Sequence, residues 1–312
     1  MAETILVLGA NGQIGTELIL KLREIYGVNN VVASDIREAN DTLKDSGPFS
    51  FVDVMSKDSI RYALDKIKPT QIYHLAAMLS AVGEQKPRLA WDLNIIGLLN
   101  VLDFSLERGI KKVYWPSSIA VFGPNSPQEM TPQYCTMDPN TVYGISKLAG
   151  ERLVEYYNEK YNMDVRGIRY PGIISWKSAP GGGTTDYAID IFHHARKTKS
   201  YECYLQGETT LPMMYMDDAI DATLSLMDCP KNKLRIKSSY NVAAVSFNPE
   251  DLTKEIKKHI PDFTISYKPD NRQKIAASWP KSIKDNYARE DWGWKEKFRT
   301  EEIVSEMLAN IK

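Results

Sequence analysis

The sequence has few cysteines, no excess of charge of either sign and no long apolar run, and each shortage excludes a class of protein. Its 312 residues include only three cysteines, at positions 135, 203 and 229, so neither a disulfide framework nor a zinc site is expected. Basic residues number 39 and acidic residues 40, which provides no basic surface for a nucleic-acid backbone. No uninterrupted apolar stretch approaches the roughly 20 residues of a membrane span.

The start of the chain and its overall composition are typical of an ordinary globular protein. Residues 1–4 contain no basic segment and run directly into a strand-like stretch, so a signal peptide is not expected. We therefore predict a cytoplasmic location, or a matrix-like compartment, in which the cysteines stay reduced. Hydrophobic residues make up 43% of the chain and charged residues 25%, which excludes wholesale disorder.

Strand-like and helix-like segments alternate strictly through the first half of the chain. Short apolar runs typical of buried strands occupy residues 4–8, 30–35, 49–52, 71–75, 112–115 and 165–169. Between them, helix patterns cover residues 14–26, 56–66, 87–107 and 141–161. This alternation with short connections predicts an α/β fold, in which a doubly wound parallel sheet carries helices on both faces.

The alternation loosens after Pro171. Residues 178–183 form a turn-rich, glycine-rich loop, and helices are predicted over 186–197, 217–228 and 249–259. Residues 240–243 are predicted to return to the sheet. We predict a nucleotide-binding domain over residues 1–175, with a return segment near 238–260, and a smaller C-terminal substrate lobe over 176–237 and 261–312.

A glycine-rich turn follows the first strand and opens the first helix. Its glycines permit a tight turn and let backbone amides approach a pyrophosphate. The helix N-terminus adds unpaired N–H groups and the positive end of the helix dipole. The turn therefore predicts a dinucleotide site, and its candidate cofactor-binding residues are Gly9, Asn11, Gly12, Gln13, Ile14 and Gly15.

An acidic residue ends the second strand where a dinucleotide-binding unit requires one. Asp35 lies 20 residues beyond Gly15, the spacing at which a carboxylate holds the adenosine ribose hydroxyls. A carboxylate there repels a 2′-phosphate, so the predicted cofactor is NAD rather than NADP. Arg37 weakens that preference slightly. Ile36 and Arg37 join Asp35 as cofactor-binding candidates.

A tyrosine and a lysine stand four residues apart in the helix predicted after the fifth strand. Tyr143 and Lys147 therefore share one helix face. A phenol is a poor base because its reference pKa is about 10. A nearby lysine cation and the positive nicotinamide of NAD favour the phenolate. Tyr143 is therefore the candidate acid/base for a substrate hydroxyl.

Two serines end the fifth strand. A hydroxyl at the carboxyl end of a parallel strand faces the ligand crevice. Ser118 lies 25 residues before Tyr143, and Ser117 is the alternative. Together, the glycine turn, the serine and the Tyr-x-x-x-Lys pair resemble the extended branch of the short-chain dehydrogenase/reductase superfamily, and further matching motifs extend over residues 5–245.

The resemblance implies a Rossmann-type fold and assigns roles by motif. Ser118 steadies the substrate oxygen, Tyr143 is the acid/base, and Lys147 orients the ribose and tunes the tyrosine. The register set by residues 121–123 favours Ser118 over Ser117. The remaining cofactor-binding residues implied by the family motifs are Asp53, Val54, Leu75, Ala76, Ala77, Asn94, Ser117, Tyr170, Pro171 and Ile173.

The glycine loop and its flank, residues 180–188, resemble the short-chain-type L-threonine 3-dehydrogenases. That resemblance implies NAD-dependent oxidation of the 3-hydroxyl of L-threonine, without a metal. Thr185 ranks ahead of Thr184 as the key contact, and Trp279 reads equally well as a packing aromatic. The implied substrate-binding residues are Ser80, Ser118, Tyr143, Gly183, Thr184, Thr185 and Trp279.

Two other functions remain open at this stage. Most members of the extended branch act on nucleotide-sugars, so an NAD-dependent nucleotide-sugar 4-epimerase or dehydratase is the main alternative. A redox-sensing regulator would bind NAD without turnover, which the complete Ser/Tyr/Lys set disfavours. The family also implies a homodimer that pairs through the 87–107 and 141–160 helices. Neither nucleic acid nor membrane is an expected partner.

Overall fold

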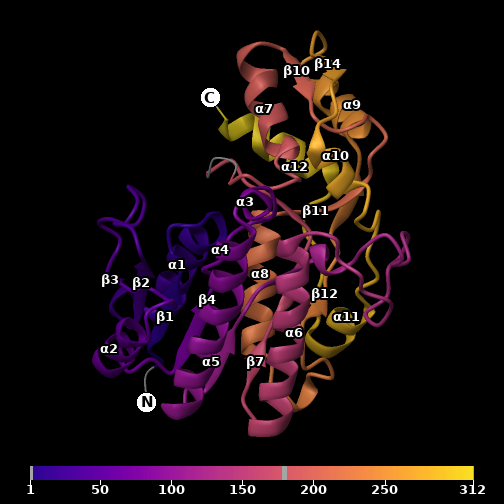
Figure 1. The fold of residues 1–312 in the computed structure, drawn as a ribbon. Coiled ribbons are helices and arrows are strands. Elements are labelled where there is room, and N and C mark those ends of the chain that lie inside the picture. The colour runs from indigo at the N-terminus through magenta and orange to yellow at the C-terminus, as the bar shows by residue number, and fades with distance from the viewer. Residues whose placement is uncertain (1–2, 178–180, 312) are drawn as a thin grey trace.

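The protein is described by a computed structural model over residues 3–177 and 181–311, and a six-stranded parallel sheet forms its centre (Figure 1). The strand order is β3-β2-β1-β4-β5-β7, so the order reverses between β1 and β4. In open α/β sheets, ligands bind at such a reversal, outside the carboxyl ends of the strands. The predicted doubly wound α/β fold is confirmed. The strands are β1 (Ile5–Leu8), β2 (Val31–Asp35), β3 (Phe49–Phe51), β4 (Gln71–His74), β5 (Lys112–Tyr114) and β7 (Val165–Arg166).

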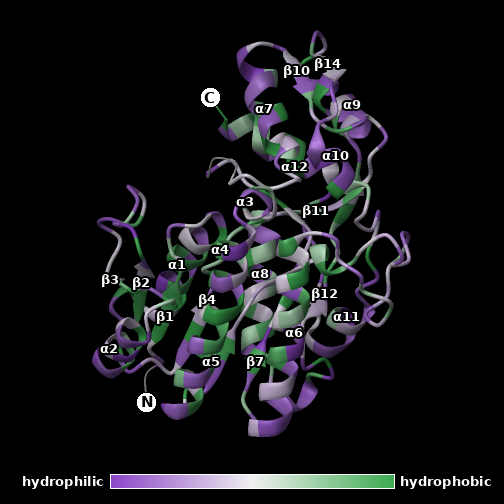
Figure 2. Cartoon of the chain, in the orientation of Figure 1, coloured by the Kyte–Doolittle hydropathy of each residue, from purple (hydrophilic) through white to green (hydrophobic). Residues whose placement is uncertain are grey.

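Helices cover both faces of this sheet because alternate strand residues point to opposite sides. Ile5 and Val7 belong to one hydrophobic cluster with helices α1 and α8, whereas Leu6 and Leu8 belong to another with α2, α5 and α6. In Figure 2, hydrophobic residues gather on the strands and on parts of these helices. The helices are α1 (Gln13–Tyr26), α2 (Lys57–Ile67), α5 (Gly97–Glu107), α6 (Val142–Tyr161) and α8 (Met216–Asp228).

The helix predicted over residues 87–107 contains a π-helical turn. Helix α4 (Pro87–Trp91) leads into the π turn Asp92–Ile96 and then into α5. By length and composition alone the run Pro87–Glu107 could cross a membrane, but 56% of its most apolar window is buried inside the protein. Its apolar character is therefore that of a core helix. π turns are frequent at functional sites.

Short strands extend the architecture beyond the main sheet. β8 (Ile168–Tyr170) pairs in parallel with both β6 (Ser117–Ser118) and β12 (Tyr240–Asn241), which places part of the predicted return segment 240–243 in a three-stranded sheet separate from the six-stranded one. β11 (Leu211–Tyr215) pairs in parallel with β9 (Gly172–Ile174) and antiparallel with β13 (Val245–Phe247). These strands join the sheet region to the lobe.

The lobe above the sheet in Figure 1 has a hydrophobic cluster of its own. Tyr187, Phe192, Leu252 and Ile303 are fully buried in it. Strands β10 and β14 pair in parallel at its edge. Its elements are α7 (Tyr187–Lys197), β10 (Ser200–Cys203), α9 (Pro249–His259), β14 (Thr264–Tyr267), α10 (Asn271–Ala276) and α12 (Thr300–Asn310).

The packing departs from the division predicted from the sequence. Helix α8 and the helix α11 (Asn286–Trp292) contribute to the sheet-side cluster, although both lie in ranges assigned to the lobe. Helix α9 packs in the lobe, although it lies in the predicted return segment. The periodicity of a helix reveals that it has an apolar face but not which core receives that face. The remaining short helices are α3 (Ser80–Gln85), η1 (Val28–Asn30), η3 (Ile119–Val121) and η4 (Lys231–Lys233).

Candidate active site

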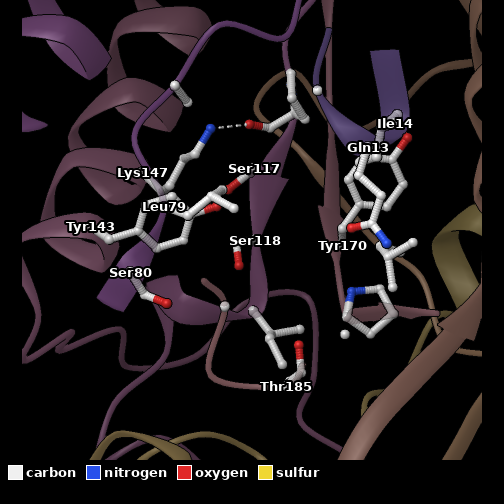
Figure 3. A pocket seen from close by; sticks show the side chains of 18 of the residues that line it. Gln13, Ile14, Leu79, Ser80, Ser117, Ser118, Tyr143, Lys147, Tyr170 and Thr185 are labelled. Carbon is white, nitrogen blue, oxygen red and sulfur yellow. Dashed lines mark hydrogen bonds between the residues drawn. The ribbon is translucent and has the colours of Figure 1, made fainter. Parts of the chain in front are cut away.

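A cavity of about 240 Å³ lies between the carboxyl ends of the sheet strands and the lobe, and Figure 3 shows its lining from close by. Strands, the N-terminus of α1, helix α6 and the glycine loop all contribute to its wall. The residues predicted from the sequence that line it are Gly9, Gly12, Gln13, Ile14, Gly15, Leu75, Ala77, Ser80, Ser117, Ser118, Tyr143, Lys147, Tyr170, Pro171, Ile173, Gly183, Thr184, Thr185 and Trp279.

The glycines of the first turn have different structural roles. Gly9 has a φ of +82°, and a Cβ there would stand 2.6 Å from the backbone nitrogen of Ala76. A Cβ on Gly15 would stand 2.5 Å from the Gly9 carbonyl oxygen. A Cβ on Gly12 would meet only that same oxygen, at 3.3 Å, among the atoms of the described residues. Gly9 and Gly15 therefore permit close packing, whereas Gly12 leaves the backbone open toward the cavity.

The start of α1 fits an anionic group. Within the described chain, the N-cap Gly12 supplies no side-chain cap and the first turn contains no acidic residue. The buried Nε2 of Gln13 has no hydrogen-bond partner among the residues that the structure describes. The free N–H groups, the helix dipole and this orphaned amide suit the pyrophosphate of a dinucleotide.

Asp35 is buried at the end of β2 and is already oriented by backbone groups. Its two carboxylate oxygens accept hydrogen bonds from the backbone N–H groups of Asn11, at 3.1 Å, and Arg37, at 3.2 Å. The Asn11 side chain is engaged elsewhere, since its Nδ2 donates to the carbonyl of Glu38 at 2.8 Å. The Arg37 guanidinium lies 3.4 Å from Asp35 and is mostly exposed.

Other predicted cofactor residues also lie outside the cavity lining as the structure describes it. Asp53 is exposed and accepts the backbone N–H of Met55 at 2.9 Å, whereas Val54 is buried in the sheet core. Ile36 is 68% exposed beside Asp35. The cofactor candidates in this group are Asn11, Asp35, Ile36, Arg37, Asp53, Val54, Ala76 and Asn94.

Asn94, in the π turn, is buried and bridges two elements. Its side-chain oxygen accepts the N–H of Met78 at 2.8 Å, and its Nδ2 donates to the Ser146 hydroxyl at 3.0 Å. The Ser146 hydroxyl in turn donates to the carbonyl of Tyr143 at 2.7 Å. The asparagine therefore ties the loop after β4 to helix α6 at the position of the tyrosine.

Ser118, Tyr143 and Lys147 meet in the cavity, as Figure 3 shows. Ser118 ends β6, while Tyr143 and Lys147 occupy successive turns of α6. The Lys147 ammonium donates to the carbonyl of Pro116 at 2.7 Å and lies 5.7 Å from the centre of the Tyr143 ring. The arrangement places a phenol, a hydroxyl and a cation around one point of the wall.

Burial shifts the pKa of both titratable groups in this set. It raises the pKa of the Tyr143 phenol to about 12, and the Ser118 hydroxyl acts in the opposite direction. It lowers the pKa of the Lys147 ammonium to about 7, and the negative charge of Glu151 opposes this change. Both shifts have one cause, because a buried site disfavours the charged form of each group.

The two serines are distinguished by their partners. The Ser117 hydroxyl donates to Glu151 at 2.6 Å, and the same carboxylate pairs with both the Nε and Nη2 of the buried Arg169, at 2.8 and 2.7 Å. The Ser118 oxygen accepts the N–H of Ala120 at 3.2 Å, which leaves its own proton available. Ser118 thus remains the serine facing the tyrosine.

Glu151 and Arg169 were missed by sequence reasoning. The spacing of Glu151, one further turn beyond Lys147 on the same helix face, is the signal that could have identified it. Nothing in the local pattern marks Arg169 as its partner, because they meet only through tertiary packing. His74 ends β4. Burial, and to a smaller extent the positive charge of Lys147, lowers the pKa of His74 to about 3, so its ring is neutral.

The opposite wall of the cavity comes from the glycine loop. Residues 178–180 of the predicted loop lie outside the described residues. The Thr184 hydroxyl lies 3.3 Å from that of Ser80, and both side chains are buried. Asp186 accepts the backbone N–H groups of Gly182 and Gly183 at 2.8 and 2.7 Å. Trp279 lines the cavity and also packs in the lobe core, and its role toward a substrate stays a prediction.

Comparisons with known proteins identify the family of the chain. A model of the NAD dependent epimerase/dehydratase family matches residues 5–243. The mitochondrial L-threonine 3-dehydrogenase of Bos taurus is 45% identical over 307 residues, which cover 98% of this chain and 82% of that protein.

Solved structures with similar sequences have the same fold. The holo form of a GalE-like L-threonine dehydrogenase from Cupriavidus necator is 48% identical, with a TM-score of 0.97 over 99% of this chain and 100% of that one. A monomeric L-threonine 3-dehydrogenase from a metagenome, in its apo form, is 49% identical, with a TM-score of 0.95 over 99% of this chain and 98% of that one. The chain is therefore a member of the NAD-dependent epimerase/dehydratase family.

Proposed function

We propose that this protein is an NAD-dependent L-threonine 3-dehydrogenase, which oxidises the 3-hydroxyl of L-threonine and yields L-2-amino-3-oxobutanoate and NADH. The observation that carries the proposal is one cavity in which the Ser118–Tyr143–Lys147 set faces the Ser80–Thr184–Thr185 wall. The near full-length similarity to L-threonine 3-dehydrogenases supports the same substrate.

The residues at the start of α1 would hold the cofactor. The pyrophosphate would lie over the open backbone at Gly12, beside the orphaned amide of Gln13. The Asp35 carboxylate would accept the adenosine ribose hydroxyls and repel an extra phosphate, which favours NAD over NADP. A bound NAD would supply the hydride acceptor and a positive charge that favours a phenolate nearby.

Tyr143 would take the proton of the substrate hydroxyl. The phenol is buried, and its pKa of about 12 means that it holds its own proton at neutral pH until a positive charge or a higher pH favours the phenolate. The Ser118 hydroxyl would donate a hydrogen bond to the substrate oxygen and hold that oxygen beside the phenol. General acid/base groups of this kind contribute about 10²–10⁴ in rate.

Lys147 would act through position and charge. Its ammonium is fixed by the Pro116 carbonyl and faces the Tyr143 ring. The protonated lysine stabilises the phenolate, whereas burial favours its neutral form. The Glu151 carboxylate, two successive helix turns from Tyr143, opposes that loss of charge. A protonated Lys147 would therefore depend in part on its neighbour Glu151.

The substrate would be held by the loop wall. Ser80, Gly183, Thr184 and Thr185 offer hydroxyls and backbone groups that suit a small zwitterion. Trp279 would close the apolar side of the cavity against the methyl group of L-threonine. This lining is compact. Among the described residues, Lys147 is its only cationic side chain, and a single cation does not favour the diphosphate of a nucleotide-sugar.

We make three further proposals, on the division of the chain, its oligomeric state and its location. We propose that residues 1–175 with the return strand β12 hold the cofactor while the remaining lobe completes the substrate side. We also propose a homodimer that buries the α4–α6 layer, and a cytoplasmic location. Apolar side chains exposed on that layer support the dimer, among them Leu89, Ile96, Ile145 and Tyr156.

A single assay tests the proposal. Purified protein is mixed with NAD or NADP and with L-threonine, L-serine or UDP-galactose, and NADH or NADPH absorbance is followed. We expect NADH with L-threonine and a clear preference for NAD. Net-neutral conversion of UDP-galactose, without NADH release, would instead establish the nucleotide-sugar epimerase. Binding of NAD without turnover of any substrate would establish a redox-sensing role.

A further inference from the structure

Helix α1 buries a carboxylate on the face that packs into the protein. The Glu17 side chain is 6% exposed, and its neighbours Leu18 and Ile19 are fully buried in the sheet-side core. A carboxylate in such a place costs free energy unless it is paired and hydrogen-bonded. A hydrophobic residue of similar size could fill the same volume. What the carboxylate adds is a directed contact, so its partners indicate its role.

The partners of Glu17 lie just beyond strand β9. The buried Ser175 hydroxyl donates to one carboxylate oxygen of Glu17 at 2.5 Å, and the Lys177 ammonium approaches the other at 3.0 Å. The backbone N–H of Lys177 donates to the Ser175 hydroxyl at 3.1 Å. Lys177 is 44% exposed, so its ion pair is screened by solvent. The buried Glu17–Ser175 hydrogen bond is the firmer of the two links.

Ser175 is continuous with the wall of the active site. It directly follows β9, whose residues Gly172 and Ile173 line the cavity. The Thr185 side chain rests on Gly172, because a Cβ at that glycine would stand 2.8 Å from both the Cβ and Cγ2 of Thr185. A displacement of β9 therefore displaces the support on which Thr185 sits.

The other end of the link is the cofactor helix. Glu17 lies two residues after Gly15, within the first two turns of the helix that begins at the glycine turn. Glu17 therefore joins helix α1, which is expected to hold the pyrophosphate, to strand β9, which supports Thr185. No other buried carboxylate of α1 makes such a link in the described chain.

We propose that Glu17 is a positioning residue, whose hydrogen bond to Ser175 fixes β9 against α1 and so sets where Thr185 stands relative to the cofactor turn. The inference rests on the proposed L-threonine 3-dehydrogenase function. A hydrogen bond to a charged acceptor is short and directional, which suits a link that must hold one distance. Small misplacements of reacting groups are costly in rate, which makes such a link useful.

The test separates positioning from simple stability. Glu17→Gln and Ser175→Ala are prepared singly and together, and Glu24→Gln serves as the matched control. Glu24 is an exposed glutamate of the same helix, paired with the exposed Lys21. KM and kcat for L-threonine, NAD affinity and thermal midpoints are measured for each protein. Ser175→Ala removes one hydroxyl only, so it serves even where Glu17→Gln folds poorly.

We expect either single variant to raise KM for L-threonine by about 3- to 30-fold, the range for loss of a charge-assisted hydrogen bond only partly transmitted to the substrate. NAD affinity stays within about 2-fold, and kcat falls less than KM rises. The double variant is no worse than the worse single variant, because both changes break one link. Glu24→Gln behaves as the wild-type protein.

Other outcomes overturn the inference in recognisable ways. An unchanged KM in Ser175→Ala, or additive effects in the double variant, excludes a shared link between Glu17 and Ser175. A fall in kcat with unchanged KM and a lower thermal midpoint indicates that the pair serves stability alone. If wild-type protein gives no NADH from L-threonine, the proposed function itself fails, and the inference falls with it.

Discussion

At the scale of single residues, the active site is governed by burial. Burial in the same part of the cavity wall raises the pKa of Tyr143 and lowers that of Lys147, so each group favours its neutral form. A neutral phenol is an acid and a phenolate is a base, so the direction of the shift determines how activity varies with pH. Below a pKa of about 12, the phenolate fraction rises with each unit of pH.

Replacement of Tyr143 by phenylalanine removes the proposed base and leaves the ring. We expect L-threonine oxidation by the wild-type protein to rise above pH 7, because the phenolate fraction rises, and to level off where the loss of charge on Lys147, whose pKa is about 7, offsets that gain. Tyr143→Phe should lose about 10²–10⁴ in kcat and with it this rise, while NAD binding persists. The measurement is the pH profile of kcat/KM together with NAD affinity.

Tyr161→Phe is the matched control for that experiment. It removes a phenol from the exposed end of the same helix, at a residue that is 40% exposed. Its profile should follow that of the wild-type protein. A Tyr143→Phe enzyme with the wild-type rate and profile would show that another group takes the proton.

At the scale of elements, the glycine loop assigns different tasks to adjacent threonines. Thr184 is 1% exposed and its hydroxyl faces Ser80 of α3, so it fixes the loop to the far side of the cavity. Thr185 is only partly buried, lines the cavity and rests on Gly172 of β9. Sequence reasoning ranked Thr185 first as the substrate contact, and this ranking stays a prediction.

Loss of the Thr185 hydroxyl should weaken threonine oxidation without affecting the cofactor. A substrate hydrogen bond is worth roughly 0.5–1.5 kcal/mol, or more when its partner is charged. Thr185→Ala should therefore lower kcat/KM for L-threonine by about 2- to 100-fold, as measured by steady-state kinetics. NAD affinity should stay the same because the cofactor turn lies on another element.

A threonine at the end of helix α7 provides the comparison for this variant. Thr198 is exposed and its hydroxyl donates to the carbonyl of His194, so Thr198→Ala should match the wild-type kinetics. Weaker NAD binding in Thr185→Ala, with threonine oxidation intact, would mean that the loop serves the cofactor instead.

At the scale of the whole molecule, apolar residues remain exposed on the helical layer of α4, the π turn and α6. Ile96 and Ile145 are 40% and 45% exposed. The Asn94–Ser146 hydrogen bond shows that the π turn and α6 are neighbours, and each of these two segments carries one of the two isoleucines. Exposed apolar patches of this kind mark interaction sites, and a second copy of the chain is the proposed occupant.

Light scattering tests the dimer. We expect a mass near twice the chain mass of 35.4 kDa at micromolar concentration. Combining Ile96→Glu with Ile145→Glu should give monomers, because charges would be buried in the interface, while circular dichroism shows the fold to be intact. A wild-type mass equal to that of one chain would contradict the proposal.

Local patterns predicted much of the sheet and its helices. Apolar strand runs, the Ser56 cap of α2 and the glycine turn depend on neighbouring residues alone, and the elements appear within a few residues of their predicted bounds. The motifs also predicted many of the side chains that line the cavity, although eight of the predicted cofactor residues lie outside its lining as the structure describes it. They did so because position at a strand end or on a helix face follows directly from the period of each element.

Long-range pairings were beyond the reach of sequence reasoning. The Glu151–Arg169 ion pair and the Glu17–Ser175 hydrogen bond join residues 18 and 158 positions apart. The π turn at Asn94 and the sharing of helices between the two cores also escaped detection. Each depends on which surfaces meet after the chain has folded.

The sequence by itself therefore determined the parallel sheet, the cofactor turn and the Ser118–Tyr143–Lys147 set. Tertiary structure alone decided which serine retains a free proton, how far burial shifts the pKa values of Tyr143 and Lys147, and which strand supports Thr185. The physical reason is the separation along the chain between the residues that interact. Periodicity and turn chemistry act over a few residues, whereas burial and buried hydrogen bonds exist only where distant segments come into contact.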